Sequence, residues 1–486
     1  MLIPVGRLQL SQAQARVATQ SSLIMAKTLL LLSCSVLSFS RVIVYGPESL
    51  RSTVARVHDG KYEIPSSLAN FGNPPYGSVI VGRVFEPVNH NDKLGCSPIV
   101  PMDFSYGDPD HVVTPIMLIE RGNCSFVQKI RHAQDVGASA VIISDNTDFD
   151  PTNTVMSDDG TGGNLNIPSF LISKSDSDLI RKALVMEAMR GIVSLTLTFE
   201  MKKGGTNVTY EIWMSADQDI TRSFLNEFAP YARKLKDITV MTPHYVLWYC
   251  SECRSVGYTF NTPDCVSSGR YCAPDPDGPG PLTGKHVVLE DLRQICLYRE
   301  AKESWWNYIQ LMNKTCPTNT FDSDCYKGVF QASGINSEKV EKCMENSFSL
   351  PGNYSSDNNL LKNERNELIK AGIFFFPAVI VNSQTMRGDI EPLEVLQAIC
   401  AGFQATPSTC TDLLEDRNQP KSISETGGIA MSTLLAVVCV AVLLLVAVLV
   451  VYRMWLKREM NTELRKQVNQ AVGQYFALAD ASRSEG

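Results

Sequence analysis

The longest uninterrupted apolar stretch of the chain lies towards its C-terminal end. Residues 429–451 contain no charged side chain. Such a run can satisfy its backbone polar groups in a bilayer only as a helix, and at about 1.5 Å per residue it crosses a hydrocarbon layer of about 30 Å. The pattern predicts a transmembrane helix; the alternative is a buried helix of a soluble domain. Arg453 and Lys457 follow the run, whereas residues 425–428 before it carry no positive charge. We therefore expect residues 452–486 to form a cytosolic tail.

A second apolar run lies near the N-terminus. Lys27 precedes the leucine-rich residues 28–32, and a small-x-small pattern, SFS, follows at residues 38–40. This order is typical of a secretory signal peptide, so we expect translation to start at Met25 and residues 1–40 to be leader and signal. With one later span, the chain is predicted to be a single-pass type I membrane protein.

Short apolar segments predict a first α/β domain at residues 41–201. Three β-branched runs bounded by Gly, Pro and Asp are typical of strands: residues 78–82, 116–119 and 140–143. Residues 127–136 have helical spacing and end before Gly137, a suitable C-cap. Strands that alternate with a helix in this way indicate a mixed α/β fold.

A second α/β domain is predicted at residues 205–410. Its candidate elements are strands at residues 210–214, 245–248 and 372–381, and helices at residues 220–235 and 392–403. Pro377 lies within the last strand, where a proline would ordinarily interrupt the ladder. This order matches a thioredoxin-like fold, in which such a proline is cis. A cysteine-rich helical insertion separates the strands, and we expect its Trp305 and Trp306 to be core residues.

The cysteine content favours an oxidising compartment. Of 14 cysteines, one lies in the signal and one in the predicted span, which leaves 14 − 2 = 12. We expect disulfides among these twelve, with Cys96 paired to Cys124: Cys96, Cys124, Cys250, Cys253, Cys265, Cys272, Cys296, Cys316, Cys325, Cys343, Cys400 and Cys410. Four glycosylation sequons lie in the same part of the chain: Asn123, Asn207, Asn313 and Asn353. The net charge of −7 argues against nucleic-acid binding.

The first domain resembles the protease-associated domain. The motifs that carry the resemblance are ERGNCSF at residues 120–126, Lys129 with Ala133, GASAVII at 137–143 and NIPSFLIS at 166–173. This domain occurs in proteases and in sorting receptors. No HExxH motif or Ser/His/Asp arrangement accompanies it here, so we expect no enzymatic activity.

The second domain resembles plant-type vacuolar sorting receptors. Five motifs occur in order: TPHYVLWYC at 242–250, GRYCAPDP at 269–276, DLRQIC at 291–296, WWNY at 305–308 and QAICAGF at 397–403. The resemblance implies a receptor of Golgi, trans-Golgi network and prevacuolar membranes that needs no cofactor and carries soluble cargo proteins to a vacuole or lysosome-like compartment. Members of the family usually carry EGF-like repeats before the membrane. Residues 411–428 form instead a short polar linker without cysteine.

The resemblance also implies a cargo-binding loop in the first domain. Its residues are Arg121, Gly122, Asn123, Cys124, Ser125 and Phe126. A loop pinned by a disulfide can present backbone N–H groups and a guanidinium to an extended peptide. The alternative is that Arg121 forms a structural salt bridge. Relatives have Asp where this chain has Asn123, within a sequon, and a glycan there would obstruct the loop.

A CxxC motif at residues 250–253 raises a rival hypothesis, a membrane-anchored thiol-disulfide oxidoreductase. In thioredoxin-like enzymes the reactive pair lies where the first core strand turns into its helix. The corresponding residues here, 216–219, contain no sulfur. We therefore expect Cys250 and Cys253 to form structural bridges.

The remaining candidates are histidines and the tail. The six histidines lack metal-ligand spacing, so no metal site is predicted, although their protonation would allow cargo release in acid: His58, His90, His111, His132, His244 and His286. In the tail, Tyr475, Phe476, Ala477 and Leu478 fit the tyrosine-based motif that clathrin adaptors bind as an extended strand. The alternative is an amphipathic helix on the membrane at residues 464–478.

Overall fold

The computed structural model describes residues 40–87, 92–102, 104, 114–187, 192–250, 263–316, 323–373, 375–415 and 452–453. The described residues from 40 to 415 belong to one compact unit, and Tyr452 and Arg453 belong to another. Within the described residues no helix is long and apolar enough to span a membrane. The predicted signal, the predicted span and the tail motif lie outside the described residues.

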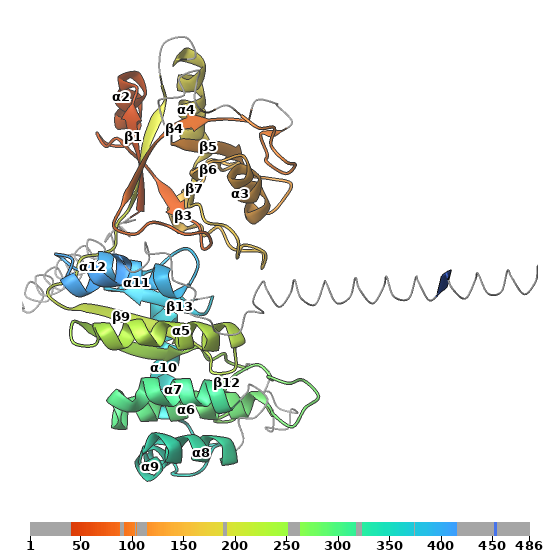
Figure 1. Cartoon of the computed structure of the whole chain (residues 1–486), viewed down its shortest axis with the longest axis vertical. Coiled ribbons are helices and arrows are strands. Elements are labelled where there is room, and N and C mark those ends of the chain that lie inside the picture. Colours follow the sequence, from red (N-terminus) through yellow and green to blue (C-terminus); the bar gives the residue numbers. More distant parts are fainter. Residues whose placement is uncertain are drawn as a thin grey trace, which may run out of the picture. The chain divides into compact units, whose positions relative to one another are not determined.

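The first domain is a mixed eight-stranded sheet with helices on both faces (Figure 1). The strand order is β2-β1-β8-β4-β5-β6-β7-β3. The strands are β1 (Ser40–Gly46), β2 (Glu63–Ile64), β3 (Ser66–Leu68), β4 (Val79–Phe85), β5 (Pro115–Glu120), β6 (Ala140–Ser144), β7 (Ser169–Ile172) and β8 (Ser194–Phe199). The helices are α2 (Glu48–Val57), α3 (Phe126–Asp135) and α4 (Lys174–Glu187), with a 3₁₀ turn at Pro151–Asn153.

The predicted strands at residues 78–82, 116–119 and 140–143 are confirmed as β4, β5 and β6. The last two are parallel, with Ile116 opposite Ala140, and all residues of β6 are buried. Such continuous apolar runs fit a parallel sheet that is covered on both faces. The predicted helix is α3, and Gly137 beyond it has a φ of +91°. The loop that enters this helix therefore starts at the carboxyl end of β5.

The second domain has a four-stranded sheet in the order β10-β9-β13-β14. The strands are β9 (Val208–Met214), β10 (Thr239–Tyr245), β13 (Ala378–Val381) and β14 (Gln384–Thr385). The second domain also contains the helices α5 (Asp219–Leu235), α11 (Pro392–Ala401) and α12 (Ser408–Glu415). The Phe376–Pro377 peptide bond is cis, as expected for this fold. The strand predicted at residues 372–381 is wrong in its first part, because Gly372 ends a helix with a φ of +64° and β13 begins only at Ala378, after the proline.

The strand predicted at residues 245–248 is wrong. The strand that pairs with β9 is β10, in which only Tyr245 belongs to the predicted range. β10 alternates buried and less buried positions and contains Pro243, which its edge position tolerates. Trp248 lies beyond the strand, 45% exposed, in an isolated bridge with Cys272. The apolar run was misleading because pairing with β9, not local hydrophobicity, defines the strand.

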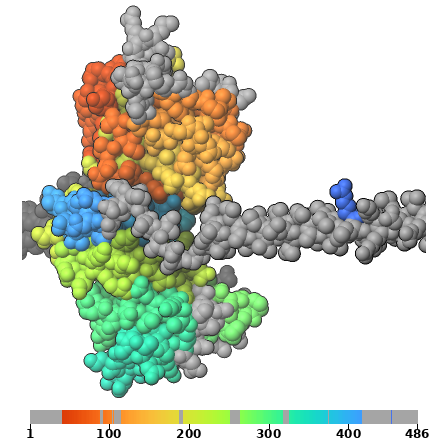
Figure 2. All heavy atoms as spheres, in the orientation of Figure 1, coloured from red at the N-terminus to blue at the C-terminus, as the bar shows by residue number. Residues whose placement is uncertain are grey.

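The insertion is helical, as predicted, and forms a lobe of the second domain, coloured green to cyan (Figures 1 and 2). It contains α6 (Gly284–Glu300), α7 (Trp305–Thr315), α8 (Ser323–Ser333), α9 (Ser337–Ser347) and α10 (Asn359–Ala371), with the short strands β11 (Cys265–Val266) and β12 (Tyr271–Cys272). Trp305 is fully buried in the core, as expected, whereas Trp306 is partly buried and packs against that core from its edge. Within the described residues, four disulfides of the second domain have both cysteines placed, and Cys250 is bonded in addition: Cys265–Cys272, Cys296–Cys343, Cys316–Cys325 and Cys400–Cys410.

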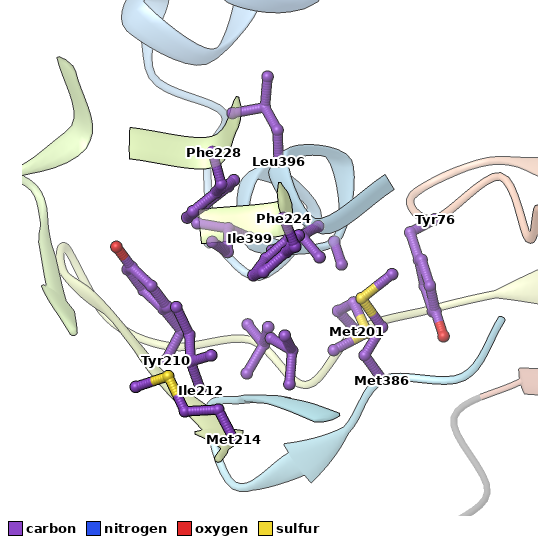
Figure 3. Close-up of a cluster of buried hydrophobic side chains, with 14 of the residues drawn as sticks. Tyr76, Met201, Tyr210, Ile212, Met214, Phe224, Phe228, Met386, Leu396 and Ile399 are labelled. Atoms are coloured by element: carbon purple, nitrogen blue, oxygen red, sulfur yellow. The ribbon is translucent and has the colours of Figure 1, made fainter. Parts of the chain in front are cut away.

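One hydrophobic cluster runs from the first domain into the second (Figure 3). Tyr76 and Met201 lie beside Met386 at one end of the close-up. The cluster continues through the buried face of β9 to helices α5 and α11, with these labelled residues: Tyr210, Ile212, Met214, Phe224, Phe228, Leu396 and Ile399. The two domains therefore share buried apolar surface.

Candidate functional site

The loop at residues 121–126 connects the carboxyl end of β5 to the first turn of α3. Gly122 has a φ of +132° and Asn123 a φ of +65°, conformations that turn the chain sharply. Ser125 then caps the helix, because its Oγ accepts a hydrogen bond from Gln128 N at 3.2 Å. Local sequence thus sets the turn and the start of the helix.

A disulfide fastens this loop to the segment before β5. Cys124 is bonded to Cys96, with 5.7 Å between their Cα atoms. Gln128 Nε2 also donates to Cys96 O at 3.0 Å, and Glu120 N donates to Lys93 O at 2.8 Å. In addition to its own chain ends, the loop therefore has one covalent attachment to the domain, the disulfide.

The buried side chain of Lys129 also holds this loop, through hydrogen bonds to backbone carbonyls. Lys129, on α3, is 0% exposed, and its Nζ donates to Leu94 O and, at 2.6 Å, to Gly122 O. Burial lowers the pKa of Lys129 to about 8, and the charge of Glu120 opposes this effect. The ammonium group is still mostly protonated at pH 7, so it holds the two backbone carbonyls together as a cation.

The Arg121 side chain makes one structural contact and is also partly exposed at the surface. Its Nη1 donates to Asp145 Oδ2 at 2.8 Å, where the carboxylate is 0% exposed and the arginine side chain is 40% exposed. The guanidinium also lies 5.7 Å from the centre of the Phe126 ring. The structural alternative for Arg121 is thus present in the structure, and the exposed part of the side chain remains available to a ligand.

The Arg121–Asp145 pair persists in moderately acidic solution. Burial alone would raise the pKa of Asp145, but hydrogen bonds from Arg121 and Thr147 outweigh it and keep the pKa below its ordinary value. A carboxyl group with a lowered folded pKa stabilises the fold above its unfolded pKa, about 3.9, and loses that contribution only at lower pH. A change from pH 7 to pH 5 therefore does not break this pair.

The sequons differ in accessibility. Asn123, Asn207 and Asn353 are exposed. Asn313 is partly buried, and its Nδ2 donates to Arg222 O and to Asn226 Oδ1, each at 3.2 Å. A glycan on that nitrogen would replace one of its two hydrogens, so at least one of these hydrogen bonds with helix α5 would be lost. Asn313 is therefore a poor acceptor in the folded chain, whereas the expectation of a glycan at Asn123 stays open.

The thioredoxin-like turn has no thiol. Between β9 and α5, Ala216 N donates to the buried Asp291 Oδ1 at 3.1 Å, and Ser215 Oγ donates to Asp217. Burial raises the pKa of Asp291 well above its ordinary value. Cys250 lies after β10 and is disulfide-bonded, and Cys253 lies outside the described residues. The polar groups at the turn thus hydrogen-bond to one another and to the buried Asp291.

We predict that the purified chain has no thiol-disulfide exchange activity above that of free thiol. Cys250→Ser should leave the background rate of insulin reduction unchanged, because no sulfur lies at the helix N-terminus where a thiol pKa would be lowered. The matched control is Cys400→Ser, which removes a bridge far from the motif. Turnover that only Cys250→Ser abolishes would establish the oxidoreductase hypothesis instead.

The described histidines occupy separate places. His58 Nε2 lies 2.6 Å from Asp176 Oδ1, His286 takes part in the capping of α6, and His132 Nδ1 lies 2.9 Å from Gly95 O, beside the Cys96 segment. His90 and His111 lie outside the described residues. Among the described residues no cluster of three or more possible metal ligands occurs.

His244 lies on the same face of the second sheet as the buried Trp213. Its ring stacks on Trp213, with 4.3 Å between centroids, and Nδ1 lies 3.0 Å from Glu364 Oε2 on α10. Burial alone would lower the pKa of His244, but the hydrogen bond and charge of Glu364, with the charge of Glu211, raise it above its ordinary value. Acid therefore strengthens this contact.

We predict that His244→Phe destabilises the chain more at pH 5.5 than at pH 8. A histidine whose folded pKa is raised contributes stability that is complete below its unfolded pKa and is lost as pH rises through the folded pKa. Phenylalanine keeps the stack on Trp213 and removes the titration. Chemical denaturation at the two pH values measures the difference, and Glu364→Gln should reproduce it. Equal losses at both pH values would contradict the assignment.

Two residues of the site were not identified from sequence as functional. Lys129 belongs to the apolar spacing of α3, beside the buried Val127, Ile130 and Ala133. A lysine on the buried face of an amphipathic helix is the signal that could have revealed it. Asp145 follows a fully buried strand, which places its carboxylate at the same sheet edge as Arg121. The predicted loop residues are adjacent in sequence, and the structure adds these two supports.

Comparison with known proteins is consistent with this architecture. The model of the PA domain matches residues 81–180, and the model of the vacuolar sorting receptor thioredoxin-like domain matches residues 208–400. Vacuolar-sorting receptor 4 of Arabidopsis thaliana is 30% identical over 413 residues, which cover 79% of this chain and 62% of that receptor. Vacuolar-sorting receptor 1 of Pisum sativum is 31% identical over 418 residues, which cover 81% and 65%. The chain is a relative of the vacuolar-sorting receptors.

The relationship does not extend over the whole of those receptors. The chain spans a little under two thirds of the length of these two relatives. Among solved structures, the reduced form of the disulfide bond oxidoreductase DsbG from Mycobacterium tuberculosis aligns with a TM-score of 0.29 and 10% identity, over 44% of this chain and 85% of that chain. That likeness is too slight to bear on function. The receptor relatives do not favour the oxidoreductase alternative.

Proposed function

We propose that the chain is a sorting receptor that binds soluble cargo proteins in the Golgi lumen and carries them to a vacuole or lysosome-like compartment. The observation that carries the proposal is the loop at residues 121–126, which a disulfide and the buried Lys129 hold in place. A loop that is already ordered loses little conformational freedom when a peptide binds. The receptor relatives support the same role.

The recognition chemistry follows from the loop. Arg121 offers the exposed part of a guanidinium, a group that pairs with carboxylates and carbonyls through two parallel hydrogen bonds. The partly exposed Phe126 ring gives an apolar surface beside it. The ligand is therefore an extended peptide with an acceptor group next to an apolar side chain. A glycan on Asn123 would restrict access from the tip of the loop.

The test is to recover the cargo. The full chain, solubilised in detergent and immobilised, is mixed with soluble secretory proteins at pH 7, and the bound proteins are identified by mass spectrometry. We expect soluble vacuolar or lysosomal proteins whose propeptides compete for binding, and we expect Arg121→Ala to lose them. Recovery of the same proteins by Arg121→Ala would remove the loop from the proposal.

The cytosolic part of the proposal rests on the tail. We propose that residues 429–451 anchor the receptor in Golgi, trans-Golgi network and prevacuolar membranes. In this topology Tyr475 and Leu478 are accessible to a clathrin adaptor, which binds such motifs as an extended strand with two side-chain pockets.

We predict that Tyr475→Ala redirects the receptor. A short extended peptide has few contacts besides its two anchors, so the loss of one costs about 2 kcal/mol, or roughly thirtyfold in adaptor affinity. Binding of tail peptides to a purified adaptor and the location of the receptor in cells measure the effect. Phe476→Ala, at a position between the anchors, is the matched control and should bind normally. Normal location of Tyr475→Ala would assign sorting to another tail segment.

A further inference from the structure

The two luminal domains meet at a closely fitted junction. Gly388 N donates to Ala69 O at 3.2 Å, and Asp389 N donates to Gly72 O at 3.0 Å. Gly388 has a φ of +88°, and a Cβ at this position would lie 2.3 Å from Pro74 Cδ. Any other residue would therefore push the domains apart.

A tyrosine completes the junction from the first domain. Tyr76 is 3% exposed, its hydroxyl donates to Arg387 O at 2.9 Å, and Arg387 N donates back to that hydroxyl oxygen at 2.7 Å. Gln397 Nε2, on α11, donates to Tyr76 O at 3.1 Å. The close-up places Tyr76 beside Met386 and Met201 (Figure 3). The backbone contacts are thus surrounded by buried apolar surface and cannot be exchanged freely for water.

Like charges gather at this junction. Asp389 lies on the segment that makes the backbone contacts, and the charges of Asp158 in the first domain and of Glu391 and Glu394 in the second act on it. Burial, followed by these three carboxylates, raises the pKa of Asp389 to about 7, against a hydrogen bond with the Gly72 backbone.

Other ionisable groups at the junction include Arg387, Tyr76 and Glu391. Burial lowers the pKa of Arg387 and raises that of Tyr76, so neither changes charge between pH 5 and pH 8. Burial also raises the pKa of Glu391, with a contribution from Glu227 on α5. Asp389, with its pKa of about 7, is thus a junction group that changes its charge close to neutrality.

We propose that the junction is an acid-strengthened latch, in which a protonated Asp389 allows the two domains to close and its ionisation beside Asp158 and Glu391 loosens them. A carboxyl group with a raised pKa in the closed state favours closure fully below its open-state pKa, about 4, and loses that contribution as pH rises through about 7. Linkage to one proton changes the ratio of closed to open forms by at most about tenfold per pH unit in this window.

Hydrogen bonds connect the junction to the loop at residues 121–126 through segment 158–164. Asp158 Oδ1 accepts hydrogen bonds from Gly160 N and Gly162 N, so its charge is fixed to the segment 158–164. The same segment contacts α3, because Arg131 donates to Thr161 O and Gln134 Nε2 donates to Asn164 O at 3.1 Å. Closure of the junction would therefore act through segment 158–164 on α3, the helix that follows the loop. Only this effect on the loop rests on the proposed function.

The experiment follows backbone amide exchange in the full chain at pH 5.5 and pH 7.5, corrected for the intrinsic pH dependence of exchange. Peptides that contain Gly388 and Asp389 report the latch, because both amides donate across the junction. We expect protection at pH 5.5 to exceed that at pH 7.5 by about tenfold, and by no more than about a hundredfold. Protection that does not change with pH would overturn the proposal.

Two variants separate the latch from general stability. Asp389→Asn keeps the shape of the side chain and cannot ionise, so its junction should be equally protected at both pH values. Asp158→Asn keeps an oxygen for Gly160 N and Gly162 N, removes one repelling charge, and should shift the midpoint of the native pH dependence to lower pH. Glu345→Gln, on the exposed side of α9, is the matched control and should behave as the native chain does.

The outcomes are distinct even where a variant misfolds. If Asp389→Asn does not fold, the midpoint of Asp158→Asn decides: a shift to lower pH supports the latch and an unchanged midpoint overturns it. An unaltered pH dependence in folded Asp389→Asn overturns it as well. The exchange measurement needs no cargo, so failure of the latch and failure of the proposed receptor function are seen separately.

Discussion

Arg121→Ala is expected to weaken binding of a cargo sorting peptide by about ten- to a hundredfold. A charge-assisted hydrogen bond in a partly dry site contributes about 1.5 to 3 kcal/mol, which corresponds to that range. The measurement is a titration of the full chain with peptides from the propeptides of co-purified cargo. Arg121→Lys should recover only part of the affinity, because an ammonium keeps the charge but not the planar pair of donors.

The buried partner of Arg121 makes a control necessary. Arg121→Ala also leaves the Asp145 carboxylate without its guanidinium, and an uncompensated buried charge destabilises a fold. Asp145→Asn removes that charge and keeps the side-chain shape, so it isolates the structural role. We expect Asp145→Asn to lower the free energy of unfolding and to keep most of the peptide affinity. If Asp145→Asn and Arg121→Ala lose affinity equally, Arg121 acts through the fold alone.

Removal of the Cys96–Cys124 bridge is expected to cost about 3 kcal/mol of unfolding free energy. The two cysteines are 28 residues apart, and closing a loop of that length restricts the unfolded chain by about this amount. The double variant Cys96→Ser with Cys124→Ser should also lose peptide affinity, because the loop then has to be ordered by the ligand. Denaturant unfolding and the peptide titration measure the two effects on one preparation.

A second bridge gives the matched control. Cys400 and Cys410 join α11 to α12 and are 10 residues apart, and neither contacts the first-domain loop. Cys400→Ser with Cys410→Ser should lower stability by a comparable amount, about 2 to 3 kcal/mol, and leave peptide affinity unchanged. If both double variants lose affinity to the same extent, the effect comes from global destabilisation, and the Cys96–Cys124 bridge has no special role in the loop.

The local sequence determined those helices and strands whose pattern of apolar side chains repeats every few residues. The β-branched runs of β5 and β6, the helical spacing of α3 and α5, and the apolar segment after Pro377 all specify their structure through side chains that are close neighbours. The turn without sulfur at residues 216–219 could be located for the same reason. The candidate loop was identified through the resemblance of the motif at residues 120–126 to the protease-associated domain, and its residues are neighbours in the sequence.

Long-range pairing decided the rest. β10 could not be placed from its own residues, because an edge strand with a proline is stabilised by its register with β9. The burial of Lys129 under the loop depends on the carbonyl of Leu94, 35 residues earlier, and the junction at Asp389 depends on residues more than 300 positions away. Burial sets the pKa of both groups, and burial is a property of the assembled domains. The sequence therefore determined which residues could act, and only the tertiary structure decided what surrounds them.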